Sequence, residues 1–137
     1  MGSEDEVREA VAEILRGRWV FDRVENKRVM PAGFADTVYT LETGARGFIE
    51  FKYLPRLDKA KVKVGLTRDQ VLFAERHGSM GGRCCLILGV GLGSRFYCFQ
   101  WWSLRGLLQP VDPSDLLKEG ELLVTADDFM TALSRRD

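Results

Sequence analysis

The chain has 137 residues and no net charge, with 45% hydrophobic and 29% charged side chains, which is typical of an ordinary globular protein. Its apolar runs are too short to span a membrane, and the acidic start SEDEVREA is unlike a signal peptide. We therefore expect one domain over residues 1–137. Cys84 and Cys85 are adjacent and would point to opposite faces of a strand, so we expect a reduced, cytoplasmic protein without a disulfide framework.

Basic side chains are in excess in the middle of the chain. Residues 44–83 carry nine basic and four acidic side chains, a net charge of +5, whereas residues 1–43 and 84–137 are net acidic. A local positive field suits a polyanionic partner, although a solvated basic loop would have the same composition.

The apolar spacing predicts elements in the order α-β-β-β-α-β-β plus a helical tail, hence a small mixed α/β sheet flanked by helices. We expect a core over about residues 4–100 and the tail over about 101–137. The expected elements are a helix at 4–16, a strand at 19–24, two strands around a turn at 43–46, a basic connection at 54–65 with a short edge strand near 60–64, a helix between Thr67 and Gly81, strands at 83–90 and 96–100, and tail helices near 101–108, after Asp112 or Ser114, and after Thr125.

The two strands around the turn at 43–46 carry the most informative polar residues. A hairpin brings Asp36 alongside Glu50, and the two-residue period of a strand puts Glu50 and Lys52 on one face. A carboxylate inside the apolar strand GFIEFKYL would be costly to bury without a cation or a metal as partner. The group therefore suits a divalent metal and a reacting phosphate, while the residue pattern leaves a structural ion pair open.

Few other catalytic arrangements can be built from this sequence. The single histidine, His77, excludes a multi-histidine zinc site, and there is no CxxC pair for thiol redox chemistry or cysteine-ligated zinc. The Gly-rich segment GVGLGS lacks the spacing of a phosphate-binding loop, so we expect a hairpin turn there.

The segment FADTVYTLETGARGFIEFK resembles the core motif of the PD-(D/E)xK nuclease superfamily, with Ala35 where a proline is usual. The helix TRDQVLFAERHG resembles that of the branch containing VRR-NUC domains and archaeal-type Holliday-junction resolvases, in which a glutamine opens the helix after the ExK strand. The resemblance spans roughly residues 4–100 and implies a restriction-endonuclease-like fold.

Carried over by position, this resemblance implies that Asp36 and Glu50 bind a Mg²⁺ or Mn²⁺ ion together with the backbone carbonyl of Phe51. Glu6 on the first helix is the expected outer acidic ligand, with Glu9 as its competitor. For either glutamate, a solvated acid near a helix N-terminus is an equal alternative.

The resemblance also assigns the remaining catalytic roles. Lys52 would hold the attacking water and offset the charge that develops on phosphorus. Gln70 would orient Lys52 or the scissile phosphate.

The implied activity is metal-dependent hydrolysis of DNA phosphodiester bonds at Holliday junctions, flaps or other branched DNA by a homodimer, because such junctions have local two-fold symmetry. The alternatives are a non-catalytic DNA-binding module on the same fold and an RNA-directed or end-processing nuclease. The small size also fits a phage or mobile-element protein. The side chains expected to reach DNA phosphates are Arg56, Lys59, Lys61, Lys63 and Arg68.

A dense aromatic segment precedes the tail and includes Trp101 and Trp102. We expect these rings to form core and a docking surface for the tail, ahead of a dimer interface or a base-stacking surface.

Overall fold

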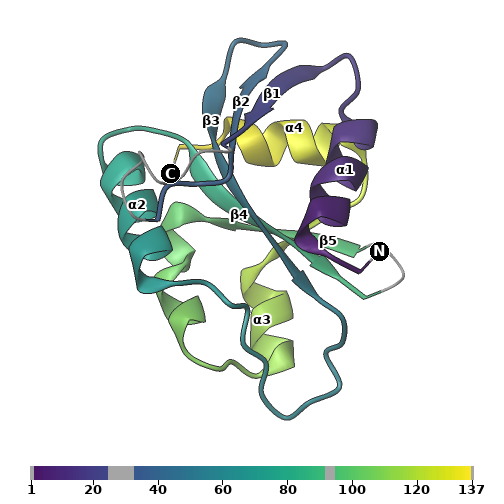
Figure 1. The fold of residues 1–137 in the computed structure, drawn as a ribbon, viewed down its shortest axis with the longest axis vertical. Helices are drawn as coiled ribbons and strands as arrows, with labels where there is room; N and C mark the ends of the chain where they lie inside the picture. Colours follow the sequence, from purple (N-terminus) through teal and green to yellow (C-terminus); the bar gives the residue numbers. More distant parts are fainter. Residues whose placement is uncertain (1, 25–32, 92–94, 137) are drawn as a thin grey trace.

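The computed structural model describes residues 2–24, 33–91 and 95–136, which form one mixed sheet with helices on both faces (Figure 1). The elements, in chain order, are α1 (Glu4–Ile14), β1 (Trp19–Arg23), β2 (Thr37–Leu41), β3 (Arg46–Leu54), α2 (Arg68–Ser79), β4 (Cys84–Val90), β5 (Arg95–Gln100), the short 3₁₀ helices η2 (Trp101–Ser103) and η3 (Arg105–Leu108), α3 (Pro113–Glu119), β6 (Glu121–Leu123) and α4 (Ala126–Ser134).

The six strands lie in the order β1-β2-β3-β4-β5-β6, and all neighbours are antiparallel except the parallel pair β3–β4. A parallel pair needs a crossover connection, and α2 supplies it between these two strands. The predicted order α-β-β-β-α-β-β and the predicted mixed sheet flanked by helices are confirmed.

The tail differs from the expected run of helices because it contains β6. This strand pairs with β5, with Leu123 opposite Phe96, and so adds a sixth strand to the sheet. Glu121–Leu123 is too short to display a two-residue alternation, which is why periodicity does not reveal it. The tail therefore completes the sheet.

The basic connection contains less strand structure than expected. The expected edge strand near residues 60–64 is a single bridge in which Val62 and Val111 exchange two backbone hydrogen bonds, of 2.9 and 2.8 Å. Val62, Val64 and Leu66 are nevertheless buried. The connection is thus fastened to the body of the protein while its lysines stay exposed.

Two apolar cores cover the two faces of the sheet. One lies under α1 and α4 and includes Ile49 and Phe51 of β3, and the other lies under α2 and α3 and includes Leu86 and Leu88 of β4. Cys85 belongs to the first core and Cys84 to the second. Cys84 and Cys85 therefore point to opposite faces of the sheet, as predicted. All three cysteines are buried and free.

Helix α2 begins with a capping box. The Thr67 hydroxyl accepts from the Gln70 backbone N–H at 3.1 Å, and the Gln70 side chain accepts from the Thr67 N–H at 2.9 Å. Thr125 and Asp128 start α4 in the same way. Both predicted helix starts are confirmed.

Trp101 joins the tail to the body of the protein. Its indole N–H donates to the Arg136 carbonyl at 3.0 Å, and its ring lies so close to Gly78 of α2 that a Cβ there would come within 2.3 Å of it. The predicted contact with the tail is confirmed for this ring, while Trp102 is 44% exposed.

In the described ranges, no helix has the length and apolar character needed to cross a membrane.

Candidate metal centre

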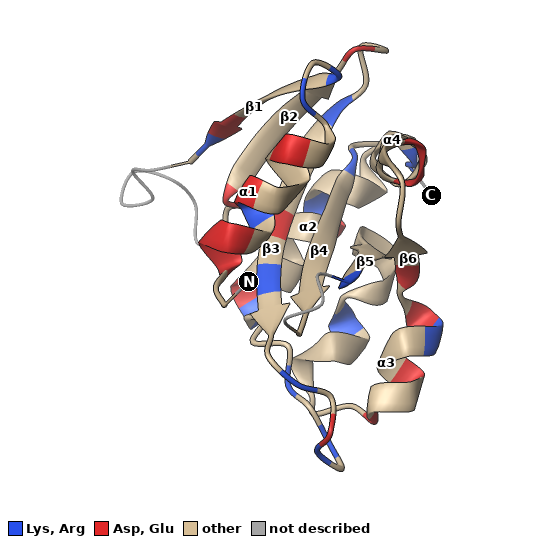
Figure 2. Cartoon of the chain, turned by 90° about the vertical axis from the view of Figure 1, so that its right-hand side faces the viewer, with Lys and Arg blue, Asp and Glu red and all other residues tan. Residues whose placement is uncertain are grey.

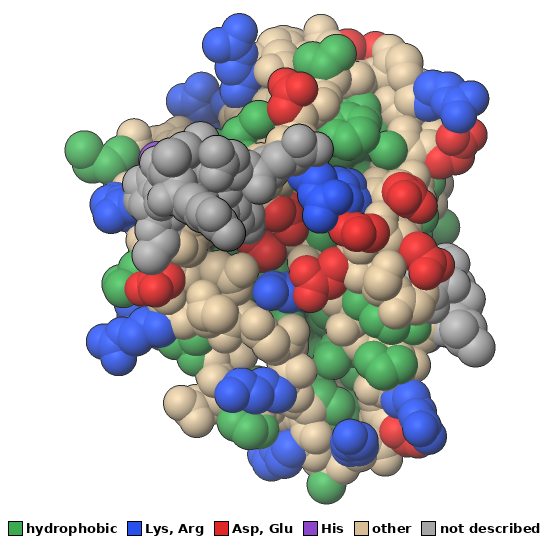
Figure 3. All heavy atoms as spheres, in the orientation of Figure 1, with side chains coloured by type: hydrophobic (Ala, Val, Ile, Leu, Met, Phe, Trp, Pro, Cys, Tyr) green, Lys and Arg blue, Asp and Glu red, His purple; other side chains and the backbone are tan. Residues whose placement is uncertain are grey.

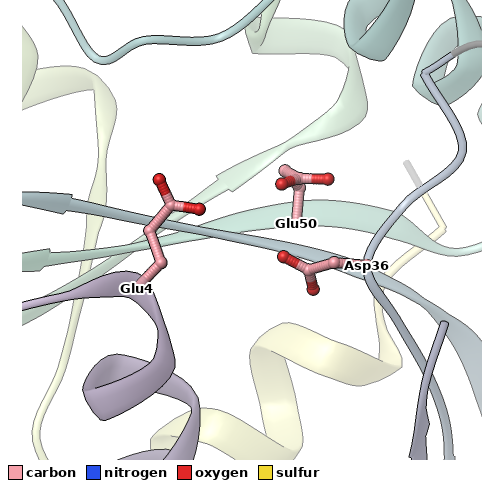
Figure 4. Close-up of side chains that lie close together, drawn as sticks. All are labelled: Glu4, Asp36 and Glu50. Atoms are coloured by element: carbon pink, nitrogen blue, oxygen red, sulfur yellow. The ribbon is translucent and has the colours of Figure 1, made fainter. Parts of the chain in front are cut away.

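Three carboxylates from three elements converge at one edge of β3 (Figure 4). Glu4 lies in the first turn of α1, Asp36 lies just before β2, and Glu50 lies in β3. Each offers a carboxylate oxygen, and these oxygens lie within 4.8 Å of one another. Such a group of hard oxygen donors matches the preference of Mg²⁺ and Mn²⁺.

The register of the hairpin explains why Asp36 and Glu50 meet. Thr37 lies opposite Ile49, so the next position along places Asp36 beside Glu50, as predicted. Asp36 itself lies in a bend at the start of the strand. Beyond Ile49, β3 continues to Leu54 paired with β4, while the β2 ladder has ended. This leaves an open edge of β3 for side chains from other elements.

At this edge, the Asp36 side chain accepts a backbone hydrogen bond from β3 where β2 no longer pairs with it. Its Oδ2 accepts a hydrogen bond from the Phe51 backbone N–H at 3.3 Å, and its Oδ1 accepts one from the Thr37 hydroxyl at 2.8 Å. Since the N–H and C=O of one strand residue point to the same side, the Phe51 carbonyl is directed to this edge as well. The strand geometry therefore supports the expected use of that carbonyl.

Glu50 and Lys52 are buried charges. Glu50 is 6% exposed and Lys52 is 8% exposed, and Lys52 Nζ lies 3.8 Å from Glu50 Oε2. Burying a carboxylate is unfavourable unless a cation compensates it, so the ammonium offsets part of the charge that the three carboxylates bring together. Figure 2 shows the acidic start of α1 next to the segment of β3 that carries an acidic and then a basic residue.

Cys84 lies close to this group but is not a candidate metal ligand. Burial and the charge of nearby Glu50 raise the pKa of the Cys84 thiol to about 12. Metals bind the thiolate, which is scarce at neutral pH when the pKa is this high. The candidate ligands are therefore all oxygens.

The carboxylate that α1 brings to this group is that of Glu4, a residue that the resemblance does not single out. The carboxylate group in the described part of the chain does not include Glu6, whose Oε2 accepts from the Gly2 N–H at 3.2 Å. Helical spacing contains the missed signal, because Glu4 shares a face with Val7 and Val11, which are fully buried against the sheet. Glu6 lies two residues further along the helix and points elsewhere. The structure thus favours Glu4 over Glu6 and Glu9 for this position.

Gln70 has a structural partner. Its side-chain carbonyl accepts the Thr67 N–H of the capping box, so this oxygen is engaged at the start of α2. The segment before Asp36 packs against the same turn, since a Cβ at Gly33 would lie 2.1 Å from the Asp69 carbonyl oxygen. The helix start is therefore close to the Asp36 segment, while the orientation of Lys52 by Gln70 stays a prediction.

Four of the five residues expected to contact DNA surround one pocket. The pocket has a volume of about 510 Å³ and begins at the end of β3, two residues beyond Lys52; its lining includes Leu54, Pro55, Pro110 and the basic residues Arg56, Lys59, Lys61 and Lys63. Arg68 does not line it and is exposed in the first turn of α2. Figure 3 shows acidic side chains around the middle of this face and basic side chains along its lower part.

Of three comparisons with known proteins, the one with solved structures finds a match, and this match concerns the fold. No family model matches the chain, and no curated protein matches it in sequence. Among solved structures, it is similar to Hjc, a Holliday junction resolvase from the archaeal hyperthermophile Archaeoglobus fulgidus. The chain shares its fold with an archaeal resolvase. The TM-score is 0.58 with 17% sequence identity, and the match covers 93% of this chain and 98% of the resolvase chain.

This similarity confirms the restriction-endonuclease-like fold predicted from the sequence. It also agrees with the resemblance to archaeal-type resolvases carried by the hairpin and by the Gln70 helix. At this identity the match shows the fold alone and assigns no role to individual side chains.

Proposed function

We propose that this protein is a divalent-metal-dependent nuclease that hydrolyses DNA phosphodiester bonds in branched DNA such as Holliday junctions. The observation that carries the proposal is the convergence of Glu4, Asp36 and Glu50 at the open edge of β3, with Lys52 3.8 Å from Glu50. A structural ion pair needs one carboxylate for its lysine, whereas in the described residues the Glu50–Lys52 pair lies beside two further carboxylates, those of Glu4 and Asp36. An ion with charge +2 would relieve this excess of negative charge.

The residues that would hold the ion are the three carboxylates and the Phe51 carbonyl. They offer oxygen atoms, which suits Mg²⁺ or Mn²⁺. A bound ion of this kind lowers the pKa of a coordinated water and polarises the phosphoryl oxygens. The hydrogen bond from the Phe51 N–H keeps the Asp36 carboxylate at this edge of β3.

Lys52 acts on the reacting phosphate and on water. Lys52 is buried, so the field of its ammonium is weakly screened, and the ammonium lies beside the Glu50 carboxylate. From there it orients the attacking water and offsets the negative charge that accumulates on phosphorus. The water oxygen forms a bond to phosphorus, one P–O ester bond breaks, and a phosphomonoester and a hydroxyl end result.

The basic pocket after β3 binds the DNA backbone beyond the cleavage point. Its lysines and arginine are exposed, and they belong to a segment anchored by the Val62–Val111 bridge. Cations on an anchored segment contact phosphates without reading bases, which suits recognition of DNA shape. Arg68 at the start of α2 adds a further phosphate contact.

Two cuts in a two-fold symmetric junction need two active sites. We expect the protein to act as a homodimer in which each protomer cuts one strand. The single set of carboxylates found in the described residues of the chain is in keeping with this arrangement.

A substrate panel tests this function. The protein is incubated with labelled linear, flap and four-way-junction DNA, with Mg²⁺ and with EDTA. The proposal predicts Mg²⁺-dependent cleavage of branched DNA and two symmetric cuts in the junction. Junction binding without cleavage in Mg²⁺ or Mn²⁺ would instead identify a non-catalytic DNA-binding module, and preferred cleavage of RNA or of DNA ends would identify an RNA-directed or end-processing nuclease.

A further inference from the structure

Thr37 is a polar residue at a position where an apolar one would be expected. It opens β2 and lies between two strands, opposite Arg23 of β1 and Ile49 of β3. Its side chain is completely buried, and the residues that follow on the same face, Tyr39 and Leu41, belong to the apolar core under α1 and α4. Valine would fill this site with nearly the same shape and without a buried hydroxyl.

The buried hydroxyl of Thr37 is hydrogen-bonded to Asp36. It donates to Asp36 Oδ1 at 2.8 Å, while the other oxygen of that carboxylate accepts from the Phe51 N–H at 3.3 Å. The carboxylate is thus held at both oxygens, by donors on β2 and on β3. A carboxylate has about four lone-pair positions, so two donors leave acceptor capacity for a cation shared with Glu4 and Glu50.

The backbone around Thr37 cannot easily move. The residue is paired on both sides within the sheet, so its hydroxyl has a fixed position relative to β3. Asp36, by contrast, lies in the bend before the strand and is half-buried. The hydroxyl therefore adds a second fixed donor, on β2, to a carboxylate that the Phe51 N–H alone holds only at its other oxygen.

From this geometry we infer that Thr37 is a positioning residue for the metal site, which orients the Asp36 carboxylate toward the ion shared with Glu4 and Glu50. The inference rests on the proposed function. Hydrogen-bond partners of metal ligands typically contribute 10–100-fold to metal affinity, so a loss in that range is expected when the hydroxyl is removed.

Mn²⁺ binding, measured by electron paramagnetic resonance without DNA, tests the inference independently of catalysis. Thr37→Val removes the hydroxyl and keeps the shape, whereas Thr37→Ser keeps the hydroxyl and removes a buried methyl group. We expect the dissociation constant of the valine variant to rise by about 10–100-fold and that of the serine variant to stay close to wild type. Thr40→Val, on the opposite face of β2, is the matched control and should bind like wild type.

Unfolding midpoints in EDTA separate this role from a structural one. The serine variant, which lacks a buried methyl group, should unfold at a lower midpoint than wild type and still bind Mn²⁺. If packing alone set the Mn²⁺ affinity, the serine variant would lose affinity and the valine variant would keep it. If the valine variant does not fold, Thr37→Ala compared with Thr37→Ser isolates the hydroxyl on a smaller side chain, and the alanine variant should show the same loss of affinity.

The outcomes are distinct. A folded valine variant that binds Mn²⁺ as tightly as wild type, or a serine variant that loses as much affinity as the valine variant, overturns the role of Thr37 while the metal site stands. Wild-type protein without saturable Mn²⁺ binding overturns the proposed function and this inference with it.

Discussion

Glu50 and Lys52 show how a buried pair differs from an ordinary surface ion pair. Exposed salt bridges contribute little to stability, and buried ones seldom repay the desolvation of both charges. Here the pair lies in the central part of β3 with Asp36 and Glu4 added to it. This costly arrangement is understandable if the group binds a cation, because function, rather than stability, then accounts for the charges.

At the residue scale, the sequence predicts the members of the site that follow from local geometry. Strand alternation and a short turn suffice to bring Asp36, Glu50 and Lys52 together. They do not predict Glu4, because its position depends on how α1 docks against β3, and docking is set by tertiary packing. Nor do they predict that Gln70 uses its carbonyl to cap α2.

Replacing Glu4 should weaken metal binding. Glu4→Gln keeps the shape but removes one charge from the carboxylate group, so we expect the Mn²⁺ dissociation constant to rise by at least about tenfold. Isothermal titration of the metal measures this. Glu6→Gln is the matched control, two residues away in the same first turn, and should bind like wild type. Equal losses in both variants would show that the general charge of the helix start acts on the metal, and that Glu4 is not a ligand.

At the element scale, the sequence predicts the connection after β3 as a basic segment with a short edge strand near residues 60–64, but it does not predict the partner that anchors this segment. The sequence shows Lys59, Lys61 and Lys63, and it predicts where they lie relative to β3. The Val62–Val111 bridge joins segments almost fifty residues apart, and no local pattern encodes such a contact. The pocket that these lysines surround is therefore a product of the tail.

Replacing a lysine of this pocket should weaken junction binding through electrostatics. Each phosphate contact contributes about 0.9 to the slope of log affinity against log salt concentration on duplex DNA. We expect Lys63→Gln to bind more weakly at low salt and to lower that slope by about this amount. Fluorescence anisotropy with a labelled junction in EDTA measures both. Lys118→Gln on α3 is the control of equal charge, and a matching decrease there would assign the effect to net charge.

Helix α4 is held by side chains from the body of the protein. Buried Gln100 and Tyr39 donate to the carbonyls of Ala132 and Leu133, at 2.9 and 2.6 Å. The guanidinium of Arg83 donates to the Ser134 carbonyl at 3.0 Å. These bonds satisfy carbonyls that the last turn of any helix leaves without intrahelical partners. The Tyr39 bond ties α4 to β2, the strand that follows Asp36, and the other two bonds tie α4 to β5 and to the residue before β4.

Removing the Tyr39 hydroxyl should destabilise the fold. Tyr39→Phe leaves the buried Leu133 carbonyl without its donor, which costs about 1–3 kcal/mol of unfolding free energy. Urea unfolding at neutral pH measures the loss. Tyr97→Phe, which alters another buried tyrosine of the sheet, is the control and should cost less. Equal losses would mean that the hydrogen bond to α4 has no special weight.

The same tyrosine predicts how stability changes in alkali. Burial raises the pKa of Tyr39 far above its ordinary value of about 10, so the folded state keeps this proton where the unfolded state releases it. The contribution is therefore complete below pH of about 10 and is lost as the pH rises further. Wild type should lose unfolding free energy more steeply than Tyr39→Phe above this pH, and equal slopes would contradict the assignment.

At the scale of the whole molecule, the order of elements could be predicted and the completed sheet could not. Long apolar periods identify α1, α2, β3 and β4, and capping residues mark where the helices begin. The three-residue strand β6 exists only because β5 offers it an edge to pair with. Short elements of this kind are decided by the assembled fold.

The whole molecule places the carboxylate group between a fixed sheet and a basic surface. β3 carries the acidic and basic residues of the site and leads directly into the basic pocket. A DNA strand held by that pocket would pass next to the open edge of β3. Under the proposed function, β3 and the loop that follows it would combine phosphate hydrolysis with substrate binding.

Single-turnover cleavage of a labelled four-way junction by wild type and by Glu50→Gln, at enzyme concentrations that saturate the DNA, tests whether the carboxylates at the edge of β3 support metal-dependent hydrolysis. We expect wild type to cut the junction in Mg²⁺ and not in EDTA, and the glutamine variant to bind the junction equally well without cutting it. Undiminished cleavage by Glu50→Gln, or cleavage by wild type in EDTA, would contradict this expectation.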